Sequence, residues 1–206
     1  MELLSDIGGY FLDSPFELVG LVSGVVCVWL LIRQNIWTWP IGLLYAAVSV
    51  LVFYRTRLYA DVLLHVFYVG MNAYGWYYWL GGGEERRQAE DLDSLPIAST
   101  PAAAWVSIVA LPGAGIVSLG WLLGTYTDAD LPYWDGATTA MSFTAMWMTA
   151  RKYIENWGVW LVVDVLATGI YLYKGIEPYA VLYGVYIGMA VWGWLSWRAA
   201  QLRQAA

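Results

Sequence analysis

The chain has 206 residues, of which 60% are apolar, 17% aromatic and only 13% charged, and its mean hydropathy is +0.55. A soluble domain carries about 25% charged residues, so this composition indicates an integral membrane protein. The net charge of −6 and the lack of a basic stripe argue against a nucleic-acid partner. The single cysteine, Cys27, excludes a disulfide framework and a cysteine-based metal site.

Seven apolar segments approach the ~20 residues that a helix needs to cross a bilayer. In chain order, the spans are predicted at 14–32, 37–54, 59–80, 101–123, 136–150, 156–173 and 178–197. Residues 1–13 form an acidic lead-in, residues 81–100 a polar loop and residues 198–206 a C-terminal tail. The predicted fold is therefore an all-α integral membrane protein with seven transmembrane helices.

The first three spans and the last three are copies of each other. Residues 29–79 align without a gap with residues 147–197, at an offset of 118 positions, and twelve pairs are identical. The pairs are Trp29/Trp147, Arg33/Arg151, Ile36/Ile154, Trp39/Trp157, Leu43/Leu161, Leu64/Leu182, Tyr68/Tyr186, Gly70/Gly188, Met71/Met189, Gly75/Gly193, Trp76/Trp194 and Trp79/Trp197. This duplication predicts two three-helix repeats, 14–80 and 134–197, joined by a linker helix at 101–123. Because three is an odd number, the extra crossing makes the two repeats parallel.

Basic residues near the span ends predict the orientation of the chain in the membrane. With the N-terminus outside, seven basic residues are cytoplasmic and three are external. The cytoplasmic residues are Arg33, Arg86, Arg87, Arg151, Lys152, Arg198 and Arg203. We therefore expect a multi-pass inner (plasma) membrane protein with its N-terminus outside and its C-terminus in the cytoplasm.

Strongly polar side chains within membrane helices face a cavity or a partner rather than lipid. At helical spacing, one face of the third span presents His65, Tyr68 and Asn72, and one face of the sixth presents Trp157, Trp160 and Asp164. The predicted binding residues are Trp39, His65, Tyr68, Asn72, Trp157, Trp160, Asp164, Tyr183 and Tyr186. Such aromatic faces with a few donors and acceptors suit a flat, cationic heterocycle that carries a hydroxylated group.

The polar residues of this set are divided unequally between the repeats. Asn72 aligns with Ala190, and Asp164 aligns with Ala46. A pocket for one asymmetric solute needs this difference, whereas a scaffold with two equivalent faces does not.

Structural interpretations of some of these residues remain open. Tryptophans near helix ends, among them Trp39, Trp79 and Trp197, are typical of an interfacial belt. The alternative for His65 is an interhelical hydrogen bond, and the alternative for Asp164 is a pairing with a threonine or tyrosine. The glycines of the repeat are typical of close helix packing; they are Gly70, Gly75, Gly188 and Gly193.

Catalytic motifs are lacking from the sequence. No GxSxG, P-loop or HExxH pattern occurs, and one histidine cannot build a multi-histidine metal site. We therefore expect no catalytic residues, no cofactor and no metal.

Two segments, WPIGLLYAAVSVLVFYRTRLYADVLLHVFYVGMNAYGWYYW and YWDGATTAMSFTAMWMTARKYIENWGVW, resemble the repeat signatures of the PnuC family of bacterial vitamin transporters. The resemblance extends from about residue 16 to residue 197. It implies a fold akin to full-length SWEET sugar transporters, a homotrimer, and uptake of nicotinamide riboside by facilitated diffusion with trapping by a cytoplasmic kinase. It also implies substrate contacts at Trp157 and Trp160, with polar positions near His65 and Asn72.

Other solutes and other classes of protein remain as alternatives. Relatives in the family handle thiamine or riboflavin, and many members have Gln in place of His65 or a residue such as Asn in place of Asp164. A SWEET-like sugar carrier, or the substrate-binding subunit of an ATP-driven importer, would share the paired repeats. We expect the solute to bind near the bilayer midplane between two helical bundles that rock against each other.

Overall fold

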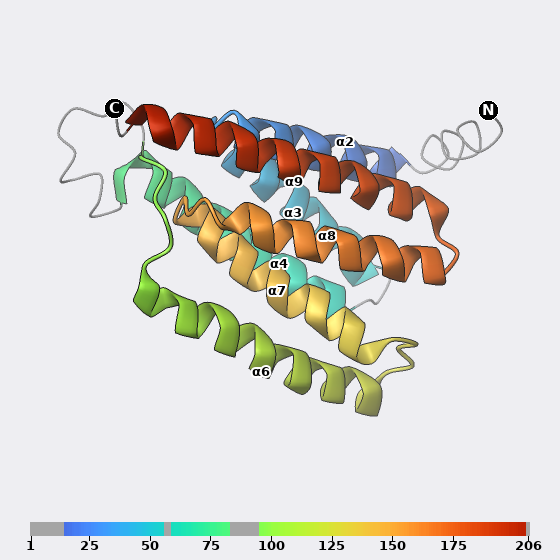
Figure 1. Ribbon diagram of the computed structural model, residues 1–206. Coiled ribbons are helices and arrows are strands. Elements are labelled where there is room, and N and C mark those ends of the chain that lie inside the picture. Colours follow the sequence, from blue (N-terminus) through green and yellow to red (C-terminus); the bar gives the residue numbers. More distant parts are fainter. Residues whose placement is uncertain (1–14, 56–58, 83–94, 205–206) are drawn as a thin grey trace.

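The computed structural model describes residues 15–55, 59–82 and 95–204 (Figure 1). Its seven long helices are α2 (Pro15–Ile32), α3 (Thr38–Arg55), α4 (Tyr59–Tyr77), α6 (Ala102–Tyr126), α7 (Pro132–Ala150), α8 (Asn156–Tyr173) and α9 (Glu177–Gln204). A π-helical turn, η1 (Tyr78–Gly82), follows α4. Apart from an isolated bridge between Ala98 and Tyr153, the described residues contain no strand. The prediction of an all-α fold is confirmed.

Three helices extend by three or more residues beyond the spans expected from the sequence, and one of them is α6, which ends at Tyr126 rather than at residue 123. Helix α9 continues through residues 198–204, which were assigned to the C-terminal tail, because no Gly or Pro interrupts that segment. Helix α7 begins at Pro132, a residue type suited to the first turn of a helix. The lead-in 1–13 and residues 83–94 of the polar loop lie outside the described residues.

Hydropathy is unevenly distributed among the described helices. Three of them, α6, α8 and α9, are long and apolar enough to cross a membrane by length and composition alone. Helices α2 and α3 contain shorter apolar stretches, and α4 and α7 carry buried polar residues such as Asn72 and Ser142. Neighbouring helices must cover these polar groups, because lipid cannot hydrogen-bond to them.

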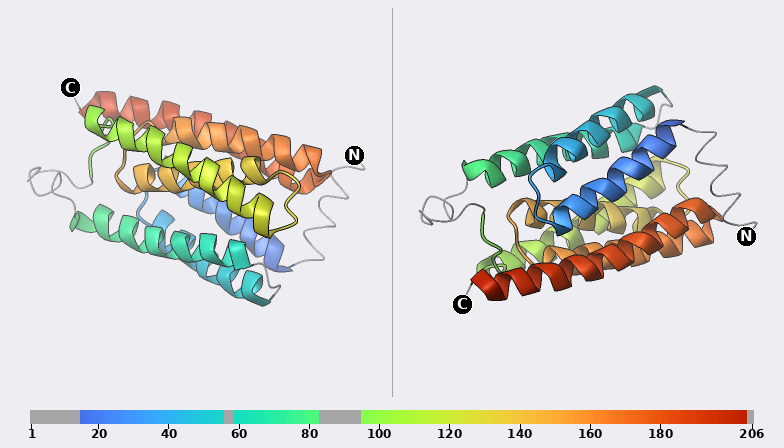
Figure 2. Two further views of the ribbon diagram at one scale, coloured as in Figure 1. Left: turned by 90° about the horizontal axis from the view of Figure 1, so that it is seen from below. Right: turned by 90° about the horizontal axis from the view of Figure 1, so that it is seen from above.

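The six repeat helices form two groups with the same internal contacts. In the first group α3 packs against α2 and α4, and in the second α8 packs against α7 and α9. Between the groups, α2 packs against α9 and α4 against α7, two contacts that the 118-residue offset interchanges. In Figure 1 the corresponding helices of the two groups run in the same direction. In Figure 2 the two groups lie on opposite sides of the molecule. Helix α6 lies outside them and packs against α7.

Four tryptophans join the groups at the end that contains the C-terminal end of α9. Trp39 meets Trp79 edge-on at a centroid distance of 5.3 Å, and Trp157 meets Trp197 likewise at 5.4 Å. Trp79 and Trp197 lie 6.3 Å apart across the two groups. All four are at most 5% exposed. The interfacial-belt interpretation was therefore wrong for Trp39, Trp79 and Trp197, because packing between the repeats buries them.

Hydrogen bonds across the groups hold this tryptophan cluster in place. The indole N–H of Trp79 donates to the carbonyl of Ala150 at 3.1 Å, and that of Trp197 donates to the carbonyl of Leu31 at 3.1 Å. Trp79 lies in η1, directly after α4, and Trp197 lies in α9, so each bond runs from the end of one repeat to the first helix of the other. The duplication has thus produced two nearly equivalent bonds that close the same end of the molecule.

A strap formed by residues 95–101 lies beside this end and contacts the second repeat. Ala98 N–H donates to the Lys152 carbonyl at 3.2 Å, and Ile154 N–H donates to the Ala98 carbonyl at 3.0 Å. The Thr100 hydroxyl donates to Glu155 at 2.7 Å, and Ile97 N–H donates to the side chain of Gln204 at 3.1 Å. The strap therefore links the α7–α8 turn to the end of α9.

Two of the repeated glycines give the tryptophans room. A Cβ at Gly75 would overlap the ring of Trp39, and one at Gly193 would overlap the ring of Trp157. No described neighbour lies within 4 Å of the Cβ position of Gly70 or Gly188. In each repeat the expected packing role therefore applies to one of the two glycines, Gly75 in the first repeat and Gly193 in the second.

Alanine substitutions test this difference. We expect Gly75→Ala or Gly193→Ala to lower the free energy of unfolding by about 1–3 kcal/mol, because the added methyl group overpacks a rigid indole. Gly70→Ala and Gly188→Ala are the matched controls, and their helix propensity improves by about 1 kcal/mol relative to glycine. Thermal unfolding of the four variants in detergent measures the effect, and equal stability of all four would contradict the packing described.

Candidate functional site

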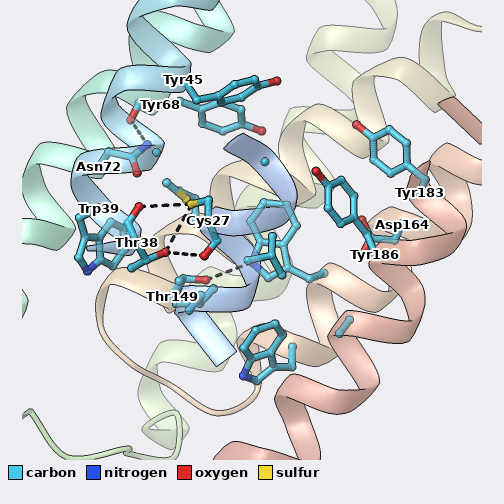
Figure 3. Close-up of a pocket in the computed structure, with 18 residues that line it drawn as sticks. Cys27, Thr38, Trp39, Tyr45, Tyr68, Asn72, Thr149, Asp164, Tyr183 and Tyr186 are labelled. Atoms are coloured by element: carbon cyan, nitrogen blue, oxygen red, sulfur yellow. Dashed lines mark hydrogen bonds between the residues drawn. The ribbon is translucent and has the colours of Figure 1, made fainter. Parts of the chain in front are cut away.

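A cavity of about 230 Å³ lies between the two groups, and all six repeat helices contribute to its wall. Its lining residues are Gly24, Cys27, Val28, Leu31, Thr38, Trp39, Gly42, Tyr45, Tyr68, Asn72, Met146, Thr149, Trp157, Trp160, Asp164, Tyr183, Tyr186 and Ala190. Helices α3 and α4 form one side, with Tyr45 and Asn72, and α8 and α9 form the opposite side, with Asp164 and Tyr183 (Figure 3). Trp39 and Trp157 connect the cavity to the tryptophan cluster.

All of the predicted binding residues except His65 reach the cavity wall. Those that line it are Trp39, Tyr68, Asn72, Trp157, Trp160, Asp164, Tyr183 and Tyr186. His65 is 6% exposed and packs edge-on against Tyr45 and Tyr68, at centroid distances of 5.9 and 5.6 Å. It lies behind the wall and supports two of the phenol rings that form it.

Several lining residues were missed by the sequence analysis. Thr38 donates its hydroxyl to the Cys27 carbonyl at 2.9 Å, and the Cys27 thiol donates to the Thr38 carbonyl at 3.3 Å. Only the packing of α2 against α3 brings these two residues together, so no local pattern could have found them. Tyr45 could have been predicted from the sequence as a lining residue, because a phenol in mid-span needs a polar partner or a cavity.

Asp164 is the acidic residue of the lining. It is 5% exposed, and among the described residues no donor or cation lies within hydrogen-bonding distance of its carboxylate. Thr168 donates to the backbone carbonyl of Asp164 at 2.7 Å and leaves its side chain free. The expected alternative, a pairing with a threonine or tyrosine, is therefore not formed, and the carboxylate faces a solute-sized space.

The two repeats exchange large and small residues around the cavity. Gly42 and Asn72 of the first repeat correspond to Trp160 and Ala190 of the second. A Cβ at Gly42 would overlap the Asn72 side chain, so the glycine is what admits the amide. The Asn72 side chain then donates to the Tyr68 carbonyl at 2.8 Å. The first repeat thus contributes the Asn72 amide to the cavity, and the second repeat contributes the Trp160 indole.

These features define a class of protein. An aromatic cavity with one carboxylate, placed between two parallel repeats of apolar helices, is the arrangement of a membrane transporter rather than of an enzyme. Among the described residues, no group of three or more His, Cys, Asp or Glu side chains is placed to hold a metal ion.

The chain belongs to the nicotinamide mononucleotide transporter family, whose model matches residues 14–199. It is 26% identical to the nicotinamide riboside transporter PnuC of Escherichia coli K12, over 92% of this chain and 87% of that protein. It is 25% identical to the riboflavin/roseoflavin transporter RibM of Streptomyces davaonensis, over 88% and 83% of the two chains. The resemblance to the PnuC family is thereby confirmed, and the chain is a multi-pass inner-membrane transporter.

The fold also matches a solved structure, the crystal structure of the vitamin B3 transporter PnuC. The TM-score is 0.72 at 22% sequence identity, and the match covers 97% of this chain and 88% of the other. At this identity the likeness supports the fold alone.

The native cysteine offers a test of the cavity. Because Cys27 lines a narrow space, we expect a small charged methanethiosulfonate to modify it in the folded protein, whereas a maleimide that carries a polyethylene glycol chain reacts only in SDS. Mass spectrometry and gel shift measure the two reactions. The control is Cys27→Ser combined with Ser99→Cys, since Ser99 is exposed and should react with both reagents. Rapid reaction of Cys27 with the bulky maleimide in the folded state would disprove the narrow cavity.

Proposed function

We propose that this chain is a uniporter for nicotinamide riboside, which binds in the cavity between the two repeats. The observation that carries this proposal is the unpaired Asp164 carboxylate among aromatic rings. Nicotinamide riboside has a flat pyridinium ring with a positive charge and a ribose with hydroxyl groups. Indole and phenol faces attract such a ring, and a carboxylate in a low-dielectric site balances its charge.

The same lining disfavours a phosphorylated solute. Among the residues that the structure describes, no lysine or arginine lines the cavity, so a phosphate group would have no countercharge there. This supports the nucleoside over the nucleotide that the family's description names. A cytoplasmic kinase that phosphorylates the product would then trap it, because the charged product fits the cavity poorly.

Riboflavin and thiamine are the alternatives within this class. The relative from Streptomyces davaonensis is named for riboflavin and roseoflavin. Riboflavin is neutral, so Asp164 has no charge to balance in that case, whereas thiamine is cationic like nicotinamide riboside. A sugar carrier akin to SWEET proteins shares the repeats but has less use for so many aromatic faces.

Binding and transport by the purified chain test the proposal directly. We expect calorimetry to detect nicotinamide riboside at micromolar or lower Kd, with much weaker binding of thiamine and riboflavin. We also expect liposomes that contain only this protein to equilibrate nicotinamide riboside without an ion gradient or ATP. Preferential binding of riboflavin, or no flux without a further subunit, would refute the assignment.

Removing the carboxylate separates the charged solute from neutral ones. Asp164→Asn keeps the shape of the side chain but removes its charge, and we expect the Kd for nicotinamide riboside to rise at least about tenfold, as for a lost charged hydrogen bond of about 1.5–3 kcal/mol. The matched control is Asp135→Asn, because Asp135 forms a surface ion pair with Lys174 at 3.4 Å. An unchanged Kd in Asp164→Asn would remove this residue from the site.

We infer further that the tryptophan cluster is the cytoplasmic gate and that the repeats rock to open it. With the N-terminus outside, the clustered end faces the cytoplasm. The second repeat also places cations over aromatic rings of the first: Arg151 over Tyr78 and Lys152 over Trp79, each 4.8 Å from the ring centroid. Opening this end has to break these contacts together with the two indole hydrogen bonds.

Phenylalanine substitutions at the gate test this step. Trp79→Phe combined with Trp197→Phe keeps two aromatic rings but removes both indole donors, at about 1 kcal/mol for each bond. We expect faster modification of Cys27 by a membrane-impermeant methanethiosulfonate added from the cytoplasmic side of oriented vesicles. The control is Trp76→Phe combined with Trp194→Phe, because these equivalent residues are 36% and 37% exposed. Equal rates in both double variants would contradict the gate.

The homotrimer and the N-out orientation also remain proposals. The resemblance supports the first, and the bias of basic residues supports the second. Crosslinking in native membranes and labelling of terminal tags address them separately.

A further inference from the structure

Behind one tryptophan of the cavity runs a short chain of hydrogen bonds. The indole N–H of Trp160 donates to the Thr149 hydroxyl at 3.1 Å. The Thr149 hydroxyl lies 3.1 Å from the amide oxygen of Asn156 and 2.8 Å from the backbone carbonyl of Ala145. Thr149 is 3% exposed and Asn156 is fully buried. The chain therefore joins α7 to the first two turns of α8, and it runs from the cavity-lining residues Trp160 and Thr149 (Thr149 is labelled in Figure 3) to the buried Asn156.

The identity of the donors and acceptors shows which atom donates at each step of this chain of hydrogen bonds. The amide nitrogen of Asn156 donates to the Tyr153 carbonyl at 2.6 Å, so its oxygen is the atom that faces Thr149. A hydroxyl has one proton, and here its two neighbours, Asn156 Oδ1 and the Ala145 carbonyl, are both acceptors. The proton goes to one of them, and a lone pair of the hydroxyl oxygen remains for the indole of Trp160.

This arrangement is specific to the second repeat and to Trp160. In the first repeat, Leu31 stands in place of Thr149 and Gly42 in place of Trp160, so both the indole donor and the hydroxyl that accepts from it are missing. Thr38 stands in place of Asn156, and its hydroxyl donates to the Cys27 carbonyl. Trp157, on the same helix as Trp160, has a buried indole N–H without a hydrogen-bond partner among the described residues. Packing against Trp197 and Gly193 holds Trp157 instead.

Trp160 is less enclosed than the other cavity tryptophans, being half-buried where Trp39 and Trp157 are each 2% exposed. Packing alone therefore constrains its χ2 rotation less tightly. A hydrogen bond at the indole nitrogen fixes the plane of the ring as well as its position. A stacking contact with a flat solute depends on that plane, because aromatic pairs have preferred relative orientations.

We propose that Thr149 is a positioning residue that sets the plane of the Trp160 indole against the bound ring, with Asn156 orienting the Thr149 hydroxyl. The ligand side of this inference rests on the proposed function, whereas the orientation of Trp160 is a property of the ligand-free protein. Without the hydroxyl, the indole N–H is left unpaired, and the ring turns toward another acceptor in the cavity.

The test uses the full-length protein in nanodiscs with ¹⁵N-labelled tryptophan. The variants are Thr149→Val, which keeps the shape but lacks the hydroxyl, Thr149→Ser, which restores it, and Trp160→Phe, which identifies the Trp160 indole resonance by its loss. Thr144→Val is the matched control, since its hydroxyl contacts only the Ala140 carbonyl of its own helix, at 3.4 Å. Thr149→Ala replaces Thr149→Val if the valine variant does not fold.

Without ligand, the Trp160 indole N–H resonance should shift and exchange faster with solvent in Thr149→Val, and remain in place in Thr149→Ser and Thr144→Val. An unmoved resonance in a folded Thr149→Val or Thr149→Ala protein overturns the inference. This readout does not depend on which solute the protein carries.

Calorimetry with nicotinamide riboside then measures the consequence for binding. Thr149→Val should raise the Kd about tenfold, which corresponds to one hydrogen bond of about 1.4 kcal/mol, and Thr149→Ser should recover most of the affinity. In the Trp160→Phe background, Thr149→Val should add nothing further. If the two losses add, the hydroxyl contacts the ligand directly and the positioning role is wrong. If the wild-type protein does not bind nicotinamide riboside, the proposed function fails, and the resonance still decides the role of Thr149.

Discussion

The closed end of this transporter depends on two indole hydrogen bonds that cross between the repeats. Trp79 bonds to α7 of the second repeat and Trp197 bonds to α2 of the first, and their rings pack against each other and against Trp39 and Trp157. Because lipid offers no hydrogen-bond partners, a buried indole N–H has to find its acceptor within the protein, and for Trp79 and Trp197 that acceptor belongs to the other repeat. Both bonds occur because the two repeats are copies of each other, so the same way of burying a tryptophan is found in each.

The cavity shows how a nearly symmetric frame holds an asymmetric site. The frame uses residues that are identical in the two repeats, such as Gly75 and Gly193 beneath the tryptophan rings. The site adds to shared lining residues such as Tyr68 and Tyr186 several positions where the repeats differ, and two of these differences compensate each other. Gly42 makes room for Asn72, whereas at the corresponding positions Trp160 lines the cavity together with Ala190. In both repeats a small residue accompanies the larger one, so the site can differ between the repeats while the bundle stays packed.

The buried Asp164 carboxylate lowers the stability of the protein, and the fold itself does not require an acidic residue at this position. A carboxylate that is 5% exposed and has no partner among the described residues opposes folding, because desolvation disfavours its charged form. Its counterpart, Ala46, is fully buried and makes no such demand on the first repeat. An acidic residue of this kind inside a membrane helix indicates a functional site, and in the function proposed above the solute supplies the missing positive charge.

The sequence by itself determined the helical class, the duplication and eight of the eighteen residues that line the cavity. Helical periodicity and internal repetition can be read along the chain, so these features need no knowledge of how the helices pack. The tertiary structure alone decided which residues line the cavity and which lie behind its wall. It placed His65 behind Tyr45 and Tyr68, buried three tryptophans that resembled an interfacial belt, and brought Cys27 and Thr38 together. It also revealed the relay from Asn156 through Thr149 to Trp160, which joins two helices. Such contacts depend on the rotation of each helix against its neighbours, and a one-dimensional pattern does not specify that rotation.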